Sequence, residues 1–296
     1  MSDRSSPVQS SSDRSNSDTA VQWLVITDLD GTLLNHQSYA YDAALVAITD
    51  LQEKNIPVIL NTSKTYAETI TIRRTLGLSD PFIVENGSCL YLPKDQFLAP
   101  PGAVSRDNYW AIVMGAQQQN ISEILQHIQL TDEQCIRLSQ CSVEQAVALT
   151  GLSEVQAAQA ISREFSEPLI WQADEAALQV FQKQLAAHDL TTLQGGRFLH
   201  VIGDCDKGSA SMRLIECYND KVKSRTVKII ALGDSANDAA MLAVADISII
   251  VNSPSNHQLS KLISADIQTK AAAPEGWQEA ISTVLTQLQL IEMPFK

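Results

Sequence analysis

Two carboxylates stand two residues apart in the segment Asp28-Leu29-Asp30-Gly31-Thr32, directly after a short apolar run. An ionised carboxylate can act as a nucleophile, and a neighbouring one that retains a proton can act as a general acid and base. Crowded acidic groups cannot all stay ionised, so a pair of this kind can divide the two tasks. On its own, an Asp-Gly pair is equally typical of a plain turn.

Three further polar groups follow apolar runs in the same way. Two hydroxyl groups and an ammonium group come from Thr62-Ser63-Lys64, and a second ammonium group comes from Lys207 at a predicted helix start. Carboxylate and amide oxygens come from Gly233-Asp234-Ser235-Ala236-Asn237-Asp238. Oxygen ligands of this type suit Mg²⁺, and the ammonium groups suit an anion such as a phosphate.

The hydrophobic pattern predicts the elements that must position these groups. Strands are expected at residues 23–27, 56–60, 81–84, 227–232 and 247–251, and helices at 41–54, 65–77 and 208–219, from 238 and from 274. Strands that alternate with helices build a parallel sheet covered on both faces. We therefore predict an α/β fold, a Rossmann-like doubly wound parallel sheet, whose carboxyl edge gathers the polar groups.

The chain divides into a core and an insertion on this pattern. Residues 21–90 and 199–296 form the predicted core, and residues 91–198, with mixed strand and helix signals, form a predicted inserted α/β domain. The stretch 153–164 is expected to be a long helix within it. Residues 1–20 are rich in Ser, Asp and Arg and are predicted to be a disordered tail.

Composition excludes several classes of protein. The net charge of -13 opposes nucleic-acid binding, and we expect no nucleic-acid partner. No apolar run reaches the length of a membrane span, so no membrane association is expected. The cysteines show no C-x-x-C spacing, which favours a reducing, cytoplasmic location; they are Cys89, Cys135, Cys141, Cys205 and Cys217.

The order of the four polar groups resembles the haloacid dehalogenase superfamily of phosphatases, with its D-x-D-G-T, Ser/Thr, Lys and G-D-x-x-N-D motifs. The resemblance implies that Asp28 is the nucleophile and Asp30 the acid and base. Lys207 and Thr62 would contact the transferred phosphate. It also implies a Mg²⁺ cofactor, and the implied metal residues are Asp28, Asp30 through its backbone carbonyl, Asp234 and, more distantly, Asn237 and Asp238.

Within this superfamily the chain resembles the mannosyl-3-phosphoglycerate phosphatases, which carry a large α/β cap. The matching segments are Thr62-Ser63-Lys64-Thr65, Arg163-Glu164-Phe165-Ser166-Glu167-Pro168, Gly195-Gly196-Arg197-Phe198-Leu199-His200 and Ala273-Pro274-Glu275-Gly276-Trp277. The last departs from the family's pattern at Ala273, where glycine is usual.

The resemblance implies a glycosyl-3-phosphoglycerate as substrate and a glycosylglycerate, a compatible solute, as product. The predicted substrate-binding residues are Ser63, Lys64, Glu85, Asn86, Arg163, Ser166, Glu167, Arg197 and His200. Of these, the two arginines suit the carboxylate, Lys64 suits either anionic group, and Glu85, Asn86, Glu167 and His200 suit sugar hydroxyls.

Several alternatives stay open at this point. The sugar can be mannose or glucose, and the ester can be sucrose phosphate or another sugar phosphate bound under the same type of cap. A phosphohexomutase, or a scaffold that binds without reacting, is further from the pattern, since all four motifs are present.

Overall fold

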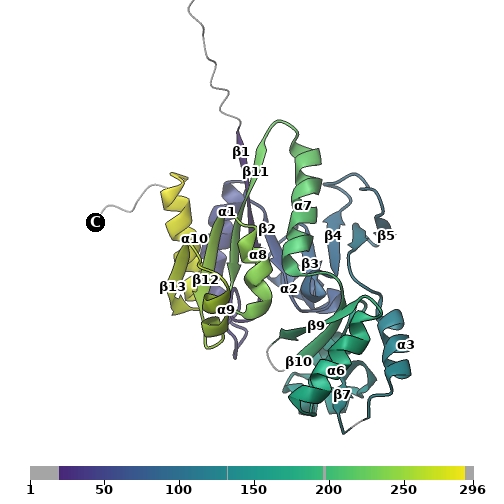
Figure 1. The fold of residues 1–296 in the computed structure, drawn as a ribbon. Coiled ribbons are helices and arrows are strands. Elements are labelled where there is room, and N and C mark those ends of the chain that lie inside the picture. The colour runs from purple at the N-terminus through teal and green to yellow at the C-terminus, as the bar shows by residue number, and fades with distance from the viewer. Residues whose placement is uncertain (1–19, 132, 196–197, 291–296) are drawn as a thin grey trace, which may run out of the picture.

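A computed structural model describes residues 20–131, 133–195 and 198–290, which form a core and a smaller second body (Figure 1). The predicted tail therefore lies outside the described residues except for Ala20, and Arg197 also lies outside them.

The core elements occupy both ends of the described chain. Its strands are β1 (Val21–Thr27), β2 (Val58–Asn61), β3 (Phe82–Val84), β4 (Cys89–Pro93), β5 (Val104–Arg106), β6 (Tyr109–Val113), β11 (Thr226–Gly233), β12 (Ile247–Asn252) and β13 (Ile267–Ala272). Its helices are α1 (Asp42–Glu53), α2 (Tyr66–Thr75), α7 (Lys207–Val222), α8 (Ala239–Ala243), α9 (Asn256–Leu262) and α10 (Glu275–Gln287), with short 3₁₀ turns η1 (Glu85–Gly87) and η3 (Ala236–Asp238).

The core strands form one sheet in the order β13-β12-β11-β1-β2-β3-β4-β6-β5. The six strands from β13 to β3 run parallel, while β4, β6 and β5 extend the sheet antiparallel. The α/β fold is thus confirmed, and the antiparallel extension is a feature that the hydrophobic pattern did not reveal.

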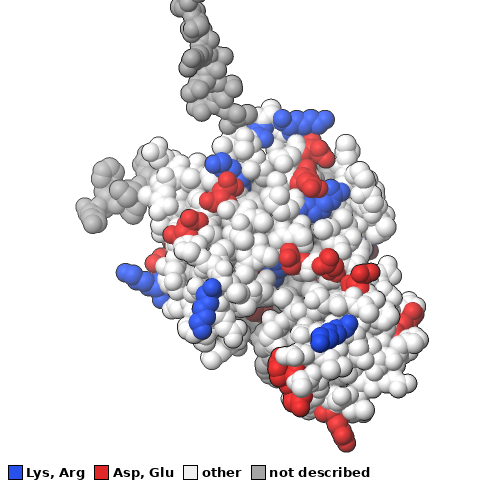
Figure 2. All heavy atoms as spheres, in the orientation of Figure 1, with Lys and Arg blue, Asp and Glu red and all other residues white. Residues whose placement is uncertain are grey.

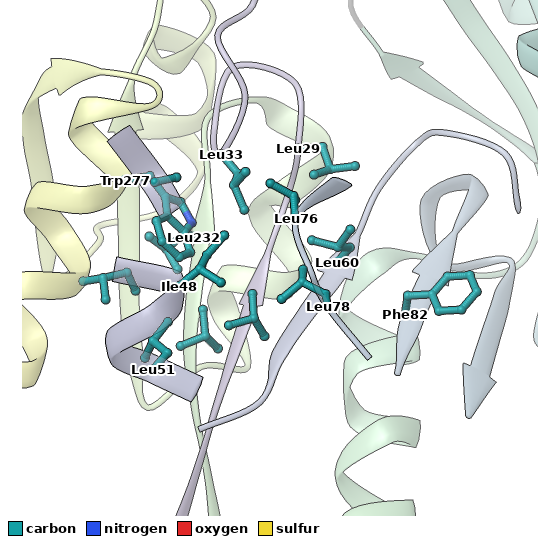
Figure 3. Close-up of a cluster of buried hydrophobic side chains, with 14 of the residues drawn as sticks. Leu29, Leu33, Ile48, Leu51, Leu60, Leu76, Leu78, Phe82, Leu232 and Trp277 are labelled. Atoms are coloured by element: carbon teal, nitrogen blue, oxygen red, sulfur yellow. The ribbon is translucent and has the colours of Figure 1, made fainter. Parts of the chain in front are cut away.

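Alternate residues of each central strand face opposite sides of this sheet. Val25 lies in one buried cluster with α1, α2 and α10, whereas Leu24 and Ile26 lie in another with α7, α8 and α9. In the first cluster, the Trp277 indole of α10 packs near Ile48 of α1 (Figure 3) and donates a 3.0 Å hydrogen bond to the Thr27 hydroxyl. Helices on both faces make the sheet doubly wound, as predicted.

Local sequence explains where the helix after β2 begins. The Thr65 hydroxyl accepts from the backbone N–H of Glu68, and the Glu68 carboxylate accepts from the backbone N–H of Thr65. This is the capping box that the S/T-x-x-E spacing predicts. It sets α2 directly behind Ser63 and Lys64, so both residues stay at the carboxyl edge of β2.

The second body contains an antiparallel sheet in the order β7-β8-β10-β9. Its elements are α3 (Gln118–Ile128), β7 (Cys135–Arg137), η2 (Leu138–Gln140), α4 (Val143–Thr150), α5 (Glu154–Ile161), β8 (Ser166–Trp171), α6 (Glu175–Ala186), β9 (Leu190–Gly195) and β10 (Phe198–Gly203). Ser153 caps α5, which ends at Ile161, so the helix is shorter than the expected 153–164. We call this body the cap.

The boundaries of the cap differ from the predicted ones at both ends. β5, β6 and most of β4, assigned to the insertion by the 91–198 prediction, belong to the core sheet, while β10, assigned to the core except for Phe198, pairs with β8 and β9. Periodicity reports that a segment is a strand but not which strand it will pair with, and this causes the error. The chain crosses into the cap near Gly115 and returns after Gly203.

No helix in the described ranges is long and apolar enough to cross a membrane. On the face in Figure 2, basic side chains lie interspersed with acidic ones. All five cysteines are free thiols. The cytoplasmic location stays a prediction.

Candidate active site

The carboxyl ends of the parallel strands bring the predicted residues together. The loop after β1 carries Asp28 and Asp30, and the loop after β11 carries Asp234. The backbone N–H of Asp28 donates to the carbonyl of Leu232 over 3.0 Å, which ties the first loop to the neighbouring strand.

Gly31 lets the two loops approach each other. Its φ is +87°, and a Cβ on this residue would lie 2.5 Å from a carboxylate oxygen of Asp234. Any other side chain would strain the backbone and collide with that carboxylate. The Asp-Gly pair is therefore part of the site geometry rather than a plain surface turn.

The Lys207 ammonium group is completely buried between two carboxylates. Its Nζ lies 2.5 Å from Asp28 Oδ1 and 2.6 Å from Asp238 Oδ1. Burial alone would lower the pKa of Lys207, but Asp238 and Asp28 raise it above its usual range, so the group stays charged. The N-cap residue Asp206 begins the helix that delivers it.

Both oxygens of Asp238 are already used within the protein. Oδ1 accepts from Lys207, and Oδ2 accepts from the backbone N–H groups of Asp234 and Ser235, each over 3.0 Å. This geometry suits a residue that orients Lys207 and the loop after β11. It suits a direct metal ligand less well, in line with the more distant role expected for it.

The arrangement fits a divalent cation. Ligand oxygens of Asp28, Asp234 and Asp238 lie within 4.8 Å of one another, and all three residues are buried. Burial raises the pKa of Asp28 to about 8 against the opposing effect of Lys207, and raises that of Asp234 to about 7. Three buried carboxylates beside one ammonium group leave excess negative charge, which a bound cation with oxygen ligands would offset.

Asp30 makes an ion pair that motif reasoning did not predict. Its Oδ2 lies 2.7 Å from the ammonium nitrogen of Lys64, on the loop after the neighbouring strand β2. Lys64 is buried, and the carboxylates of Asp30 and Glu68 raise its pKa above the usual range even though desolvation opposes them. The proposed acid and base therefore has a cation as its direct neighbour.

These groups open into a cavity of about 330 Å³ between the core and the cap. Eight of the predicted site residues line it: Asp28, Asp30, Ser63, Lys64, Arg163, His200, Asp234 and Asn237. Thr62 and Lys207 are buried next to these residues without lining the cavity themselves. We call this space the active-site cavity.

Two predicted substrate-binding residues of the cap, Arg163 and His200, line this cavity but differ in their hydrogen bonding. The Arg163 guanidinium donates to the carbonyls of Ala160, over 3.0 Å, and Ser63, over 2.6 Å, so it fastens the cap to the loop after β2. The His200 ring is buried, and its Nδ1 has no hydrogen-bond partner within the described chain. Burial and then the charge of Arg163 lower the pKa of His200 to about 3, so the ring is neutral at pH 7.

The predictions that Glu85 binds a sugar hydroxyl and that Ser166 binds the substrate do not fit their positions. The buried Glu85 carboxylate accepts from the backbone N–H groups of Glu164 and Phe165, at 3.0 and 3.1 Å, and from the Ser166 hydroxyl. Positive φ angles at Glu85 and Asn86 turn this segment toward the cap. Both carboxylate oxygens of Glu85 accept hydrogen bonds from the residues at and just before the start of β8. Glu85 therefore joins the core to the cap and does not line the cavity.

The prediction that Glu167 binds a sugar hydroxyl does not fit its position either. Its buried carboxylate lies inside the cap and accepts from Arg137 Nη2 over 3.2 Å and from the backbone N–H and hydroxyl of Ser139. Side chains alternate along a strand, so Glu167 on β8 points away from the cavity face. Asn86 also lies outside the cavity lining, where its Oδ1 accepts from the Asn237 amide over 3.1 Å and so positions that residue.

Replacing Glu85 by alanine is expected to lower the free energy of unfolding by about 2–3 kcal/mol, because two backbone N–H groups and a hydroxyl lose their acceptor in a buried place. Urea unfolding would measure the change. Glu53→Ala, at an exposed position near the end of α1, is the matched control and should change it by less than about 0.5 kcal/mol. Equal stability of both variants would contradict the assigned role of Glu85.

Several cavity residues escaped the sequence analysis. His36 and Tyr39 follow the first motif, Phe198 begins β10, and Leu138 and Leu152 come from the cap. Phe198 stands in the quoted segment Gly195-Gly196-Arg197-Phe198-Leu199-His200, but the others have no spacing or residue type that separates them from ordinary loop or core residues. The S/T-x-x-E spacing identifies Glu68 only as a helix-capping residue, although it also lines the cavity.

Comparison with known proteins agrees with this geometry. The family model of the haloacid dehalogenase-like hydrolases matches residues 25–276. A glucosyl-3-phosphoglycerate/mannosyl-3-phosphoglycerate phosphatase of Methanococcoides burtonii is 36% identical over 265 residues, which cover 88% of this chain and 97% of that protein. One of the same name from Persephonella marina is 30% identical over 267 residues, covering 90% and 98% of the two chains.

The fold itself has solved counterparts. A phosphatase of the haloalkanoate (HAD) enzyme superfamily from Bacteroides thetaiotaomicron superposes with a TM-score of 0.66 at 18% identity, over 95% of this chain and all of the other. The likeness extends through core and cap alike. The chain therefore belongs to the haloacid dehalogenase-like hydrolases and, within them, to the mannosyl-3-phosphoglycerate phosphatase family, and it is a phosphoric monoester hydrolase.

Proposed function

We propose that this enzyme hydrolyses glucosyl- or mannosyl-3-phosphoglycerate to the glycosylglycerate and inorganic phosphate, using Mg²⁺. The observation that carries the proposal is the meeting of Asp28, Asp30, Asp234 and Lys207 at one sheet edge, beneath a cap-covered cavity. The names of the two relatives supply the ester class.

Asp28 is the proposed nucleophile. Its carboxylate oxygen attacks phosphorus, the bond from phosphorus to the ester oxygen breaks, and an aspartyl-phosphate forms. Lys207, held 2.5 Å from Asp28, keeps this carboxylate in one orientation and offsets charge on the phosphoryl oxygens. The Thr62 hydroxyl oxygen accepts a hydrogen bond from the backbone N–H of Lys64 over 3.2 Å. The O–H of Thr62 is the proposed donor to a phosphoryl oxygen.

Asp30 is the proposed acid and base. It donates a proton to the leaving alkoxide and then takes one from the water that attacks the aspartyl-phosphate, which restores Asp28 and releases phosphate. The residues that would hold Mg²⁺ are Asp28 and Asp234 through carboxylate oxygens and Asp30 through its backbone carbonyl. When bound, the ion supplies positive charge between these carboxylates and the phosphate dianion.

The cap side of the cavity suits a polar, anionic glycoside. A neutral imidazole at His200 can donate or accept a hydrogen bond to a hydroxyl, and Phe198 offers an apolar ring beside it. The Gly195 backbone lies so close to His200 that a Cβ there would be 3.2 Å from the ring. The sugar is therefore proposed to lie against β9 and β10 of the cap.

A panel of phosphate esters tests the proposal, with inorganic phosphate release measured in the presence of Mg²⁺. We expect kcat/KM for glucosyl- and mannosyl-3-phosphoglycerate to exceed that for sucrose 6-phosphate and glucose 6-phosphate by at least about 100-fold. Chelation of Mg²⁺ should abolish turnover of every ester, and adding Mg²⁺ back should restore it. A flat profile across the panel would refute the proposed substrate. Loss of substrate without release of phosphate would instead favour a phosphohexomutase.

A further inference from the structure

Two cationic side chains line the active-site cavity among the described residues, Lys64 and Arg163. The Arg163 guanidinium is already bonded to two backbone carbonyls, those of Ala160 and Ser63. Backbone carbonyls at this place cannot move aside without opening the junction of core and cap. These two bonds fix the Arg163 guanidinium at that junction, whereas the Lys64 ammonium group lies 2.7 Å from Asp30 Oδ2, directly beside the reacting groups. Lys64 is therefore the group through which a negatively charged part of a ligand can act on Asp30.

The Lys64 ammonium group is held by side chains, which can exchange. Its Nζ lies 2.7 Å from Asp30 Oδ2 and 3.9 Å from Glu68 Oε1, and 5.1 Å from the centre of the Tyr39 ring. Glu68 is itself fixed, because its other oxygen accepts from the backbone N–H and hydroxyl of Thr65. Asp30 is thus the partner that can leave Lys64.

The Asp30 carboxylate is only partly satisfied by its ion pair with Lys64. Its second oxygen, Oδ1, is buried and accepts no hydrogen bond within the described ranges, although the side chain as a whole is about 30% exposed. While Asp30 Oδ2 is bonded to Lys64, this carboxyl group is directed to the loop after β2. For the acid-base role proposed above, it has to face the oxygen of the leaving group instead.

A carboxylate on the substrate could replace Asp30 at little cost. The buried ammonium group would exchange one carboxylate for another and keep its charge paired. A hydroxyl or amide in the same place would leave Lys64 with only the more distant carboxylate of Glu68, 3.9 Å away, so it could not displace Asp30 as well. The exchange would therefore occur only with substrates that carry a second anionic group in addition to the phosphate.

We propose that Lys64 selects for the substrate carboxylate and that this carboxylate, by taking Lys64 from Asp30, frees Asp30 to act on the leaving group. The inference rests on the proposed function and adds the source of its specificity. It assigns the carboxylate to Lys64, whereas the family resemblance predicts Arg163 and Arg197 for it. Lys64 is a positioning residue toward Asp30 and a binding residue toward the substrate.

The test compares glucosyl-3-phosphoglycerate with its carboxamide, a matched pair that differs in one charge. In the unaltered enzyme we expect kcat/KM to favour the acid by about 10- to 100-fold, with part of the preference in kcat. In Lys64→Met this preference should fall to within about 3-fold, and kcat for the amide should rise above that of the unaltered enzyme, because Asp30 is no longer held.

Three further variants complete the experiment. Lys64→Arg should keep most of the preference, and Lys183→Met, an exposed lysine on α6, should keep all of it. Lys64→Gln replaces Lys64→Met if thermal unfolding shows that the latter is not folded. An unchanged preference in the folded Lys64 variant, or equal losses on acid and amide, would overturn the carboxylate assignment. A kcat for the amide that does not rise would overturn the release of Asp30.

The experiment distinguishes a wrong substrate assignment from a wrong role of Lys64. If the unaltered enzyme hydrolyses neither glycosyl ester, the substrate assignment is refuted. The same comparison with 3-phosphoglycerate and glycerol 1-phosphate, which differ in the same carboxylate, then tests Lys64 alone. A preference for 3-phosphoglycerate that depends on Lys64 would support the inference, and one that does not would overturn it.

Discussion

Replacing Asp28 by asparagine is expected to lower kcat by at least about 1000-fold, because an amide oxygen cannot form the aspartyl-phosphate. The fold should survive the change. Lys207 keeps the carboxylate of Asp238 at 2.6 Å, so removing the charge of Asp28 does not leave the buried ammonium group unpaired. The amide oxygen can still accept from Lys207, and we expect the free energy of unfolding to change by less than about 1 kcal/mol.

Phosphate release and thermal unfolding measure the two effects. Asp189→Asn is the matched control, since Asp189 is exposed on the cap with a φ of +56°, which asparagine tolerates well. The control should retain full activity. If Asp28→Asn kept more than about 1% of the parent kcat, Asp28 would not be the nucleophile.

Replacing Lys207 by methionine is expected to remove both activity and much of the stability. The change leaves Asp28 and Asp238 buried without the ammonium group that lies 2.5 and 2.6 Å from them. Breaking one side of such a buried ion pair costs about 3–5 kcal/mol, a large share of the stability of an ordinary domain. Turnover should fall by at least about 100-fold, because charge on the phosphoryl oxygens is no longer offset.

A double variant separates lost charge from lost packing. In Lys207→Met with Asp238→Asn, one unpaired charge is gone, and we expect part of the unfolding free energy to return while activity does not. Urea unfolding of the parent, both single variants and the double variant gives this coupling. Purely additive losses would show that Lys207 stabilises the core by packing rather than by pairing with Asp238.

Local pattern was enough to predict the reacting groups. Asp28, Asp30 and Asp234 follow strands that periodicity identifies, and the carboxyl ends of parallel strands meet at one edge; Lys207 begins the predicted helix α7. The structure confirms that these four gather there, while their chemical roles stay predictions. The capping box at Thr65 and Glu68 was equally readable, because both partners lie within one turn.

Residues farther from these strand ends could not be placed in the same way. Glu85 has a polar side chain in a turn, which suits a ligand as well as it suits a neighbouring backbone. Only the packed chain shows that the N–H groups of Glu164 and Phe165, some eighty residues away, occupy it. A buried acceptor forms hydrogen bonds with the donors that packing places beside it. When those donors are distant in the chain, sequence spacing does not predict them.

The sequence by itself thus determined the α/β class, the two-carboxylate loop and the set of groups at the sheet edge, because strand periodicity and turn chemistry are local. The tertiary structure decided that β4, β5 and β6 extend the core sheet, that Glu85 joins the core to the cap, that Glu167 binds other residues within the cap, and that Lys64 pairs with Asp30. These are contacts between segments distant in the chain, and their partners are chosen by packing and by the need to satisfy buried charges.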